Sequence, residues 1–202
     1  NGGSTHYAVE DLGLMCSLVN MTVVSISDPM MVREVLQQSM SLPGPLYIRT
    51  GVGKKDTVIY DFDELDISIG RGIVAREGTD ITLFCHGEMV AQAMQAAAAM
   101  ADEGVSVRVV DIFTLKPIDV DLIKQCADDT HRFVVLEDHL MASGLAQCIA
   151  NVLADQMIHL DWFRRLGIPQ VFAGFGEDKE LRDKYGYGLQ DTIVALREAA
   201  VH

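Results

Sequence analysis

Residues 81–110 decide the fold, because they contain the clearest strand–helix–strand pattern in the chain. They read ITLFC at 81–85, HGE at 86–88, MVAQAMQAAAAMAD at 89–102, EG at 103–104 and VSVRVV at 105–110. The continuous apolar run at 81–85 predicts a strand buried on both faces, as in a parallel sheet. The alanine-rich stretch predicts a helix that ends at Glu103-Gly104. The segment therefore predicts a βαβ unit.

The same alternation continues toward the C-terminus. Strands are predicted at 72–76, 133–136 and 169–173, and helices at 117–128, 144–154, 178–185 and 189–199. Together with residues 81–110, this order predicts a three-layer, doubly wound α/β domain with a mostly parallel sheet over residues 67–202.

Residues 1–52 predict part of a second α/β domain. A strand at 22–26 is followed by a helix that begins around Ser27-Asp28-Pro29 and ends near Ser41, and then by a strand at 46–49. The polar, turn-rich segment that follows is read as a linker at 53–66. One long surface loop inside a single domain is the alternative, but structureless loops beyond about 12–15 residues are uncommon in compact domains.

The composition excludes several classes of protein. The 202 residues carry 29 acidic and 16 basic side chains, with a net charge of −13, which argues against nucleic acid as the main partner. The longest uncharged stretch, 12–27, is too short and too polar to span a bilayer.

The four cysteines are widely spaced, which disfavours structural zinc and favours reduced thiols in the cytoplasm. Because residue 1 is Asn rather than Met, and no signal peptide is visible, we expect an excised piece of a longer chain.

Two residues are candidates for anion binding. His6 lies in a Gly-Gly-Ser-Thr segment ahead of a predicted helix, whose free N–H groups favour a phosphate. The alternative is a capping segment, with Thr5 as the N-cap and His6 solvated. Arg49 ends a predicted strand, where ligands bind in open α/β sheets, and Arg suits bidentate phosphate recognition. A surface or interface ion pair is an equal alternative for Arg49.

Two further polar clusters have structural alternatives. His86-Gly87 forms either an anion-binding loop or simply a tight turn. Glu137-Asp138-His139 suits acid–base chemistry, but an inter-subunit or inter-domain polar contact is slightly preferred. Gly70-Arg71-Gly72 lacks a third glycine and a following helix, so it does not predict a dinucleotide site. The sequence contains no G-x-S-x-G, H-E-x-x-H or P-loop motif.

Several stretches together resemble transketolases. GSTHYAVEDL at 3–12 is similar to the G-x-[ST]-H-x-x-x-E-D loop and helix of their pyrimidine-binding domain, and NMTV at 20–23 and SD at 27–28 are similar to the strand and helix start that follow. YIRTG at 47–51 resembles the strand that ends that domain. DIFTLKPID at 111–119, LEDH at 136–139 and SGL at 143–145 resemble two signatures of the transketolase C-terminal domain.

The resemblance implies a domain organisation and a chemistry. Residues 1–52 would be the last part of a pyrimidine-binding domain, and residues 67–202 a C-terminal domain. The family uses thiamine diphosphate and a divalent metal such as Mg²⁺ to move a two-carbon ketol unit between sugar phosphates. His6 would face the substrate channel, and Arg49 would bind the substrate phosphate. Gly2 stands where the family has an acidic residue, and Ser143 stands in a usual Gly-Gly pair.

The resemblance also implies what lies elsewhere. The family's metal–diphosphate motif is missing from the sequence, so no metal ligand and no cofactor-binding residue is assigned to this chain. We therefore expect a chain that is inactive alone and that works with an N-terminal metal- and diphosphate-binding half or subunit, as a homodimer.

Three functions stay open at this point. The first is the C-terminal part of a transketolase, which the TLKP stretch at 114–117 favours. The second is a portion of 1-deoxyxylulose-5-phosphate synthase or of a 2-oxoacid dehydrogenase β-subunit, which share this C-terminal domain. The third is a non-catalytic dimerisation or regulatory module, for which we expect an open sheet edge around Val23 and Tyr47.

Overall fold

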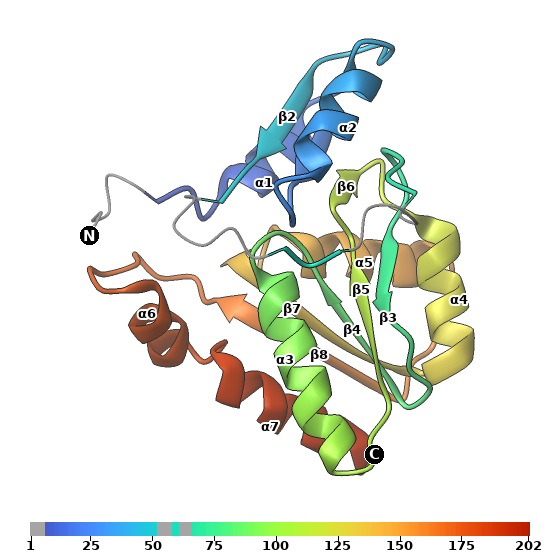
Figure 1. Cartoon of the computed structure of the whole chain (residues 1–202), viewed down its shortest axis with the longest axis vertical. Helices are drawn as coiled ribbons and strands as arrows, with labels where there is room; N and C mark the ends of the chain where they lie inside the picture. Colours follow the sequence, from blue (N-terminus) through green and yellow to red (C-terminus); the bar gives the residue numbers. More distant parts are fainter. Residues whose placement is uncertain (1–6, 52–57, 61–65) are drawn as a thin grey trace.

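Two sheets organise the chain, in a computed structural model that describes residues 7–51, 58–60 and 66–202 (Figure 1). The smaller sheet has three strands in the order β2-β1-β6, and the larger sheet has five in the order β3-β5-β4-β7-β8. The strands are β1 Thr22–Ser25, β2 Leu46–Arg49, β3 Ile73–Arg76, β4 Ile81–Cys85, β5 Val107–Asp111, β6 Thr114–Lys116, β7 Arg132–Leu140 and β8 Trp162–Ile168. The helices are α1 Asp11–Ser17, α2 Met31–Ser39, α3 Met89–Asp102, α4 Val120–Thr130, α5 Leu145–Asp155, α6 Asp178–Tyr185 and α7 Leu189–Ala200.

The larger sheet is mostly parallel, which confirms the predicted fold class. β4 pairs in parallel with both β5 and β7, β7 pairs in parallel with β8, and β3 pairs antiparallel with β5 at one edge. The chain moves outward from β4 to β5 and then returns to place β7 on the other side of β4. The switch point of this doubly wound sheet therefore lies between β4 and β7.

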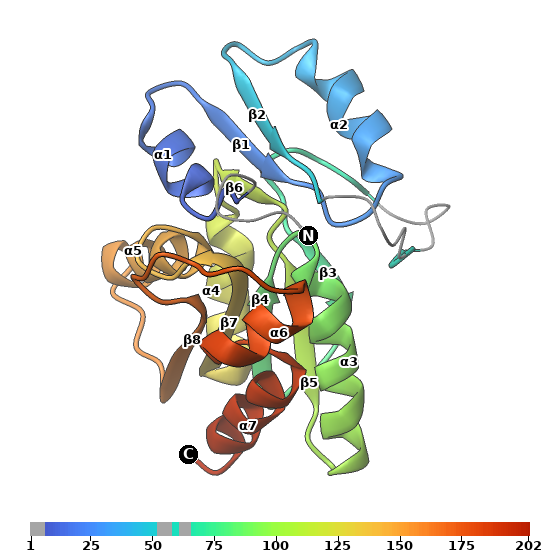
Figure 2. The same ribbon diagram turned by 90° about the vertical axis from the view of Figure 1, so that its left-hand side faces the viewer.

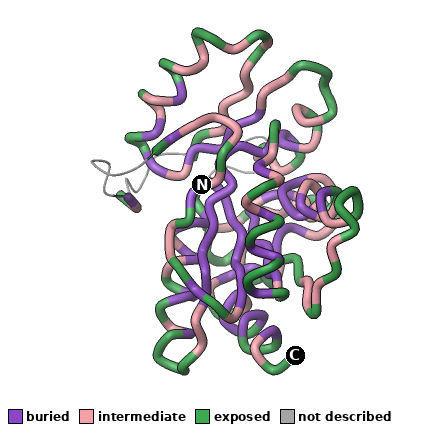
Figure 3. The backbone as a smooth tube through the Cα atoms, turned by 90° about the vertical axis from the view of Figure 1, so that its right-hand side faces the viewer, coloured by how far each residue is buried: buried purple, intermediate pink, exposed green. Residues whose placement is uncertain are grey.

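Alternating side chains on the strands fill two apolar layers, one on each face of the sheets. In β4, Leu83 packs with α3 and α7, whereas Phe84 packs with α4 and α5. β1 divides its side chains in the same way: Val24 joins the α3 layer, together with α2, and Val23 joins the α4 layer, together with α1. Figure 3 shows the buried strands of the larger sheet running through its middle, whereas β2 is only partly buried. The two layers therefore continue across the boundary between the sheets.

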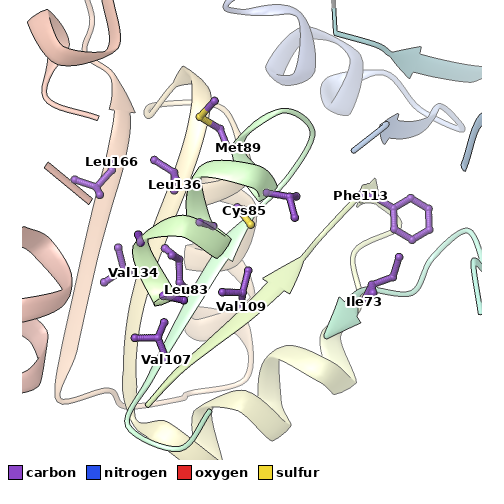
Figure 4. Packing of buried hydrophobic residues seen from close by; sticks show 14 of the residues in the cluster. Ile73, Leu83, Cys85, Met89, Val107, Val109, Phe113, Val134, Leu136 and Leu166 are labelled. Carbon is purple, nitrogen blue, oxygen red and sulfur yellow. The ribbon is translucent and has the colours of Figure 1, made fainter. Parts of the chain in front are cut away.

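The smaller sheet is completed by a strand from the C-terminal part of the chain. β1 pairs in parallel with β2 and antiparallel with β6, and the Ser25 amide donates to the Phe113 carbonyl at 2.7 Å. Phe113 is fully buried in the α3 layer, at the opposite end of the labelled cluster from Val107 (Figure 4). We call residues 7–51 the N-terminal segment and residues 66–202 the C-terminal part; β6 joins them. The boundaries 1–52, 53–66 and 67–202 stay a prediction.

One predicted strand is wrong, and one strand was not predicted. Residues 169–173 are irregular, and the strand lies earlier, at β8. The adjacent Arg164 and Arg165 break the apolar pattern there, because β8 is the edge strand and both side chains are exposed. The short β6 precedes Pro117, and among the described strands it pairs with β1 alone, which is far away in the sequence.

Several predicted boundaries move in the structure. β7 continues through Glu137-Asp138-His139, which were expected to mark the end of a strand. The predicted 117–128 helix begins later, at Val120, because Asp119 caps it by accepting from the Leu122 amide at 3.1 Å. The predicted 27–41 helix is shorter at both ends, as α2.

The open sheet edge that was expected around Val23 and Tyr47 is present at β2 but not at β1. β1 is an inner strand, because β6 pairs with its second edge, and the Val23 side chain is fully buried in the α4 layer. β2, which carries Tyr47, is the outer strand of the smaller sheet. In the ranges that the structure describes, no helix is long and apolar enough to cross a membrane.

The position of Phe113 gives a test of this arrangement. Phe113→Ala should lower the free energy of unfolding by about 3 to 5 kcal/mol, because it removes a fully buried ring from the layer that both parts share. Phe172→Ala is the matched control: that ring is fully exposed, so the change should stay within about 0.5 kcal/mol. Urea unfolding measures both, and equal effects of the two variants would contradict the shared layer.

Candidate functional site

The carboxyl ends of strands from both sheets meet at the boundary between them. Ser25 ends β1 and Arg49 ends β2, while His86 follows β4 and Asp138 lies near the end of β7. The His86 Nδ1 atom lies 2.9 Å from the Ser25 hydroxyl, and the Arg49 guanidinium contacts Asp138. We call Ser25, Arg49, His86 and Asp138 the boundary cluster. Because ligands of doubly wound proteins bind at the carboxyl ends of strands near a switch point, this cluster is the candidate site.

Arg49 is the most highly connected residue of the boundary cluster. Its Nη1 atom donates to Asp138 Oδ1 at 2.7 Å, and its Nε atom lies 3.2 Å from Asp11 Oδ2. Its Nη2 atom donates to the carbonyls of Asp138 at 3.3 Å and Ala8 at 3.5 Å. The side chain is 17% exposed. Arg49 therefore forms the interface ion pair that the sequence left open as an alternative to phosphate binding.

The charges around Arg49 stabilise one another. Burial alone would lower the pKa of the Arg49 guanidinium, but the Asp138 and Asp11 carboxylates outweigh burial, and the net effect is to raise this pKa. Burial alone would raise the pKa of Asp138, but Arg49, with His86 and Arg182, lowers it to about 2. The pair therefore stays charged at neutral pH. Truncating one partner would leave a poorly hydrated charge behind, which is more costly than losing an exposed ion pair.

Asp11 links the ion pair to two other side chains. Its Oδ2 atom accepts a hydrogen bond from the Tyr47 hydroxyl at 2.7 Å, and its Oδ1 atom lies 3.7 Å from His139 Nε2. Burial, followed by this hydrogen bond, raises the pKa of Tyr47 to about 12, so the phenol stays protonated. Burial lowers the pKa of His139. Asp11 therefore joins α1, β2 and β7 in one polar network.

His86 and Gly87 form a tight turn against the N-terminal segment. The Gly87 amide donates to the Ser27 hydroxyl at 3.0 Å, and its φ of 56° lies in the left-handed region that favours glycine. A Cβ at Gly87 would lie 2.8 Å from Ser25 Oγ. The structure therefore favours the turn over the anion-binding loop, since the amide already has an acceptor. Burial lowers the pKa of His86 to about 3, so its imidazole is neutral.

Glu137, Asp138 and His139 make three separate contacts. The fully buried Glu137 carboxylate accepts from the amides of Leu145 at 2.7 Å and Ala146 at 3.1 Å, at the start of α5. Asp138 pairs with Arg49, and His139 faces Asp11. These contacts favour the interpretation of Glu137-Asp138-His139 as polar contacts between parts of the chain over an acid–base role.

The structure describes only one of the two predicted site residues. His6 lies outside the described residues, and Arg49 lies in the boundary cluster. Sequence reasoning missed Asp11, Tyr47 and Ser25, which supply partners to the cluster. The only signal was that Asp11 and Tyr47 stand inside stretches that resemble family motifs. Among the residues that the structure describes, no group of three His, Cys, Asp or Glu side chains could hold a metal ion.

The C-terminal part matches a known family. The family model described as "Transketolase, C-terminal domain" matches residues 70–191. The chain belongs to the transketolase family. The resemblance that the sequence motifs carried is thereby confirmed, and the match contains both C-terminal signatures.

Curated transketolase relatives match nearly the whole chain. A subunit of the apulose-4-phosphate transketolase of Phocaeicola vulgatus is 29% identical over 88% of this chain and 59% of its own length. The putative transketolase C-terminal section of Methanocaldococcus jannaschii is 34% identical over 96% of this chain and 60% of its own length. The 1-deoxy-D-xylulose-5-phosphate synthase of Heliobacterium modesticaldum is 31% identical over 98% of this chain and 30% of its own length.

A solved transketolase structure supports the same assignment. The chain described as "Split gene transketolase, inactive beta4 tetramer" superposes with a TM-score of 0.84 and 34% identity, over 98% of this chain and 63% of that one. This transketolase chain thus spans about three fifths of the subunit and section that it matches.

The buried His86 predicts how the stability of the transketolase chain depends on pH. Because the folded chain keeps this imidazole neutral, only the unfolded chain takes up its proton as the pH falls below about 6.5. The folded state should therefore lose about 2 kcal/mol between about pH 8 and about pH 5 relative to His86→Asn, which cannot titrate. Urea unfolding of both proteins at the two pH values measures this. A difference between them that does not change with pH would contradict a neutral buried His86.

Proposed function

We propose that this chain is the C-terminal part of a thiamine-diphosphate-dependent transketolase that transfers a two-carbon ketol unit between sugar phosphates. The observation that carries the proposal is the structural match to a split-gene transketolase chain over 98% of this chain at 34% identity. The TLKP stretch forms β6 and the start of the following loop, in the position where the N-terminal segment joins the C-terminal part.

We propose further that the chain acts with an N-terminal metal- and diphosphate-binding subunit or half, and as a homodimer. Of two relatives that match nearly the whole chain, one is named as a transketolase subunit and the other as a transketolase C-terminal section. In this proposal the partner supplies the donors for thiamine diphosphate and Mg²⁺, and the chain alone is inactive. The described residues do not fit a metal site, since they contain no suitable group of three ligands. The cytoplasm stays the predicted compartment.

Two side chains of this chain would contact the substrate. His6 would face the substrate channel, and Arg49 would bind the phosphate of the sugar. Arg49 can do so without leaving its partners, because Nη1 makes one contact, to Asp138, and its second N–H has no acceptor in the part of the chain that the structure describes. The two acidic partners fix the guanidinium plane, so little side-chain entropy would be lost when a phosphate binds.

The synthase is the second candidate, because a 1-deoxy-D-xylulose-5-phosphate synthase matches this chain at 31% identity. A 2-oxoacid dehydrogenase β-subunit portion and a non-catalytic dimerisation or regulatory module complete the set. The candidates differ in the product that the chain, assembled with a partner half, would form from its substrates, and the non-catalytic module would form none.

A reconstitution experiment tests the proposal. Mixing the chain with candidate metal-binding halves, thiamine diphosphate and Mg²⁺ should yield ketol transfer from a pentulose phosphate, whereas each half alone should yield none. Formation of 1-deoxyxylulose 5-phosphate from pyruvate and glyceraldehyde 3-phosphate would favour the synthase instead. Tight calorimetric binding of thiamine diphosphate and Mg²⁺ to the chain alone would contradict the proposed division of ligands.

Arg49 provides a test at one residue. In an active assembly, Arg49→Lys should raise the KM for a phosphorylated sugar about tenfold or more, because Lys keeps the charge but loses the planar pair of donors. The KM for the unphosphorylated sugar should change little. Arg71→Lys is the control, since Arg71 is 63% exposed and pairs with Asp119, a residue outside the boundary cluster. An equal rise in both KM values would remove Arg49 from phosphate recognition.

A further inference from the structure

Two cysteines from distant parts of the sequence lie together at the boundary. Cys16 is on α1 in the N-terminal segment, and Cys148 is on α5 in the C-terminal part. α1 packs directly against the start of α5: a Cβ built on Gly13 would lie 2.6 Å from the Cβ of Ser143 (Figure 2). Cys16, one helical turn after Gly13, packs against the apolar layer to which Leu145 belongs. Cys16 and Cys148 therefore stand on the two helices that meet at this contact.

The thiols of Cys16 and Cys148 lie close enough to interact with each other, and both residues are half-buried. The other two cysteines differ. Cys85 and Cys126 are fully buried, and they contact the Val110 carbonyl and the Arg108 guanidinium. Only one pair among the four cysteines therefore combines mutual contact with access to solvent.

The surroundings favour a reactive thiolate on Cys16. The Lys116 ammonium is held nearby by the carbonyls of Cys16 at 3.0 Å and Leu18 at 2.6 Å. The neighbouring Cys148 thiol, with the Lys116 ammonium, lowers the pKa of Cys16 against the effect of burial, whereas the neighbouring Cys16 thiol and burial raise the pKa of Cys148. Because the thiolate is the nucleophile in thiol–disulfide exchange, Cys16 would attack first and Cys148 would resolve.

We propose that Cys16 and Cys148 form a redox-active pair that a small disulfide such as oxidised glutathione converts into a disulfide between the N-terminal segment and the C-terminal part. The Cys16 thiolate attacks one sulfur of the small disulfide, forming a mixed disulfide and releasing one small thiolate. Cys148 gives up its proton and attacks the Cys16 sulfur, which releases the second small thiolate. The two protein thiols are oxidised by two electrons, and one small disulfide is reduced to two thiols.

The disulfide would affect the boundary cluster through α1. Asp11 begins α1 and pairs with Arg49, and α5 begins where Glu137 caps it. A covalent bond between the two helices would therefore fix the position of Asp11 relative to β7. It would also raise the melting temperature, because it closes a long loop of the unfolded chain.

The test uses the whole chain with oxidised glutathione under native conditions. Non-reducing peptide mapping should show a Cys16–Cys148 disulfide, with Cys85 and Cys126 free. The melting temperature should rise, and a reductant should reverse the change. In Cys148→Ser, Cys16 should stay as a mixed disulfide with glutathione, and in Cys16→Ser, Cys148 should react far more slowly.

Cys126→Ser is the matched control and should form the same disulfide as the unchanged chain. Four free thiols after treatment, or a disulfide that contains Cys85 or Cys126, would overturn the proposal. A mixed disulfide on Cys16 that Cys148 does not resolve in the unchanged chain would also overturn it.

Discussion

The antiparallel pairing of β6 with β1 is the interaction on which the rest of the structure depends. β6 belongs to the C-terminal part, yet its partner is the central strand of the N-terminal sheet. This pairing makes β1 an inner strand, and beside it the Phe113 carbonyl accepts from the Ser25 amide while the Phe113 ring is buried in the shared apolar layer. It also fixes where β1 and β2 end, so Ser25 and Arg49 arrive at the carboxyl ends of β4 and β7. The boundary cluster is therefore a consequence of backbone pairing, and its polar contacts refine a placement that the sheets already determine.

A polar cluster in this position is costly unless its members satisfy one another. Arg49, Asp11 and Asp138 each lose hydration, and the loss is offset because the guanidinium donates to Asp138 and forms an ion pair with Asp11. The Tyr47 hydroxyl donates to Asp11 Oδ2, whereas Asp11 Oδ1 and His139 Nε2, 3.7 Å apart, have no hydrogen-bond partner among the described residues. Such a network specifies one relative arrangement of the two parts more strongly than an apolar contact of the same size would. A shift of the N-terminal segment would leave charges unpaired, so this network makes the geometry around Arg49 specific.

The sequence predicted the elements whose signal is local and missed those whose reason lies far away in the chain. The apolar run at Ile81–Cys85 and the helix Met89–Asp102 are read from their own residues, and both match the structure. β6 could not be predicted, because three residues before a proline form a strand only when β1 is beside them. β8 was misplaced, because an edge strand exposes Arg164 and Arg165 and so lacks the continuous apolar run of a central strand. Arg49 was found by its position at a strand end, but its partners Asp11 and Asp138 lie in the N-terminal segment and in the C-terminal part, and no spacing rule connects them.

The DIFTLKPID signature shows why a family can be recognised more firmly than a reaction. Asp111 accepts a hydrogen bond from Tyr60 at 2.8 Å, Phe113 fills the shared layer, and the Thr114 hydroxyl accepts from the Gly70 amide at 3.2 Å. Lys116 binds two carbonyls at the end of α1, and Asp119 both caps α4 and accepts from the Gly72 amide at 3.0 Å. Each of these side chains makes a contact that joins segments of this chain, and each is explained without a substrate. Recognition of the family therefore depends on contacts inside the chain, whereas in the proposed function the choice of reaction depends on the groups that contact the substrate, and Arg49 is the proposed one among the described residues.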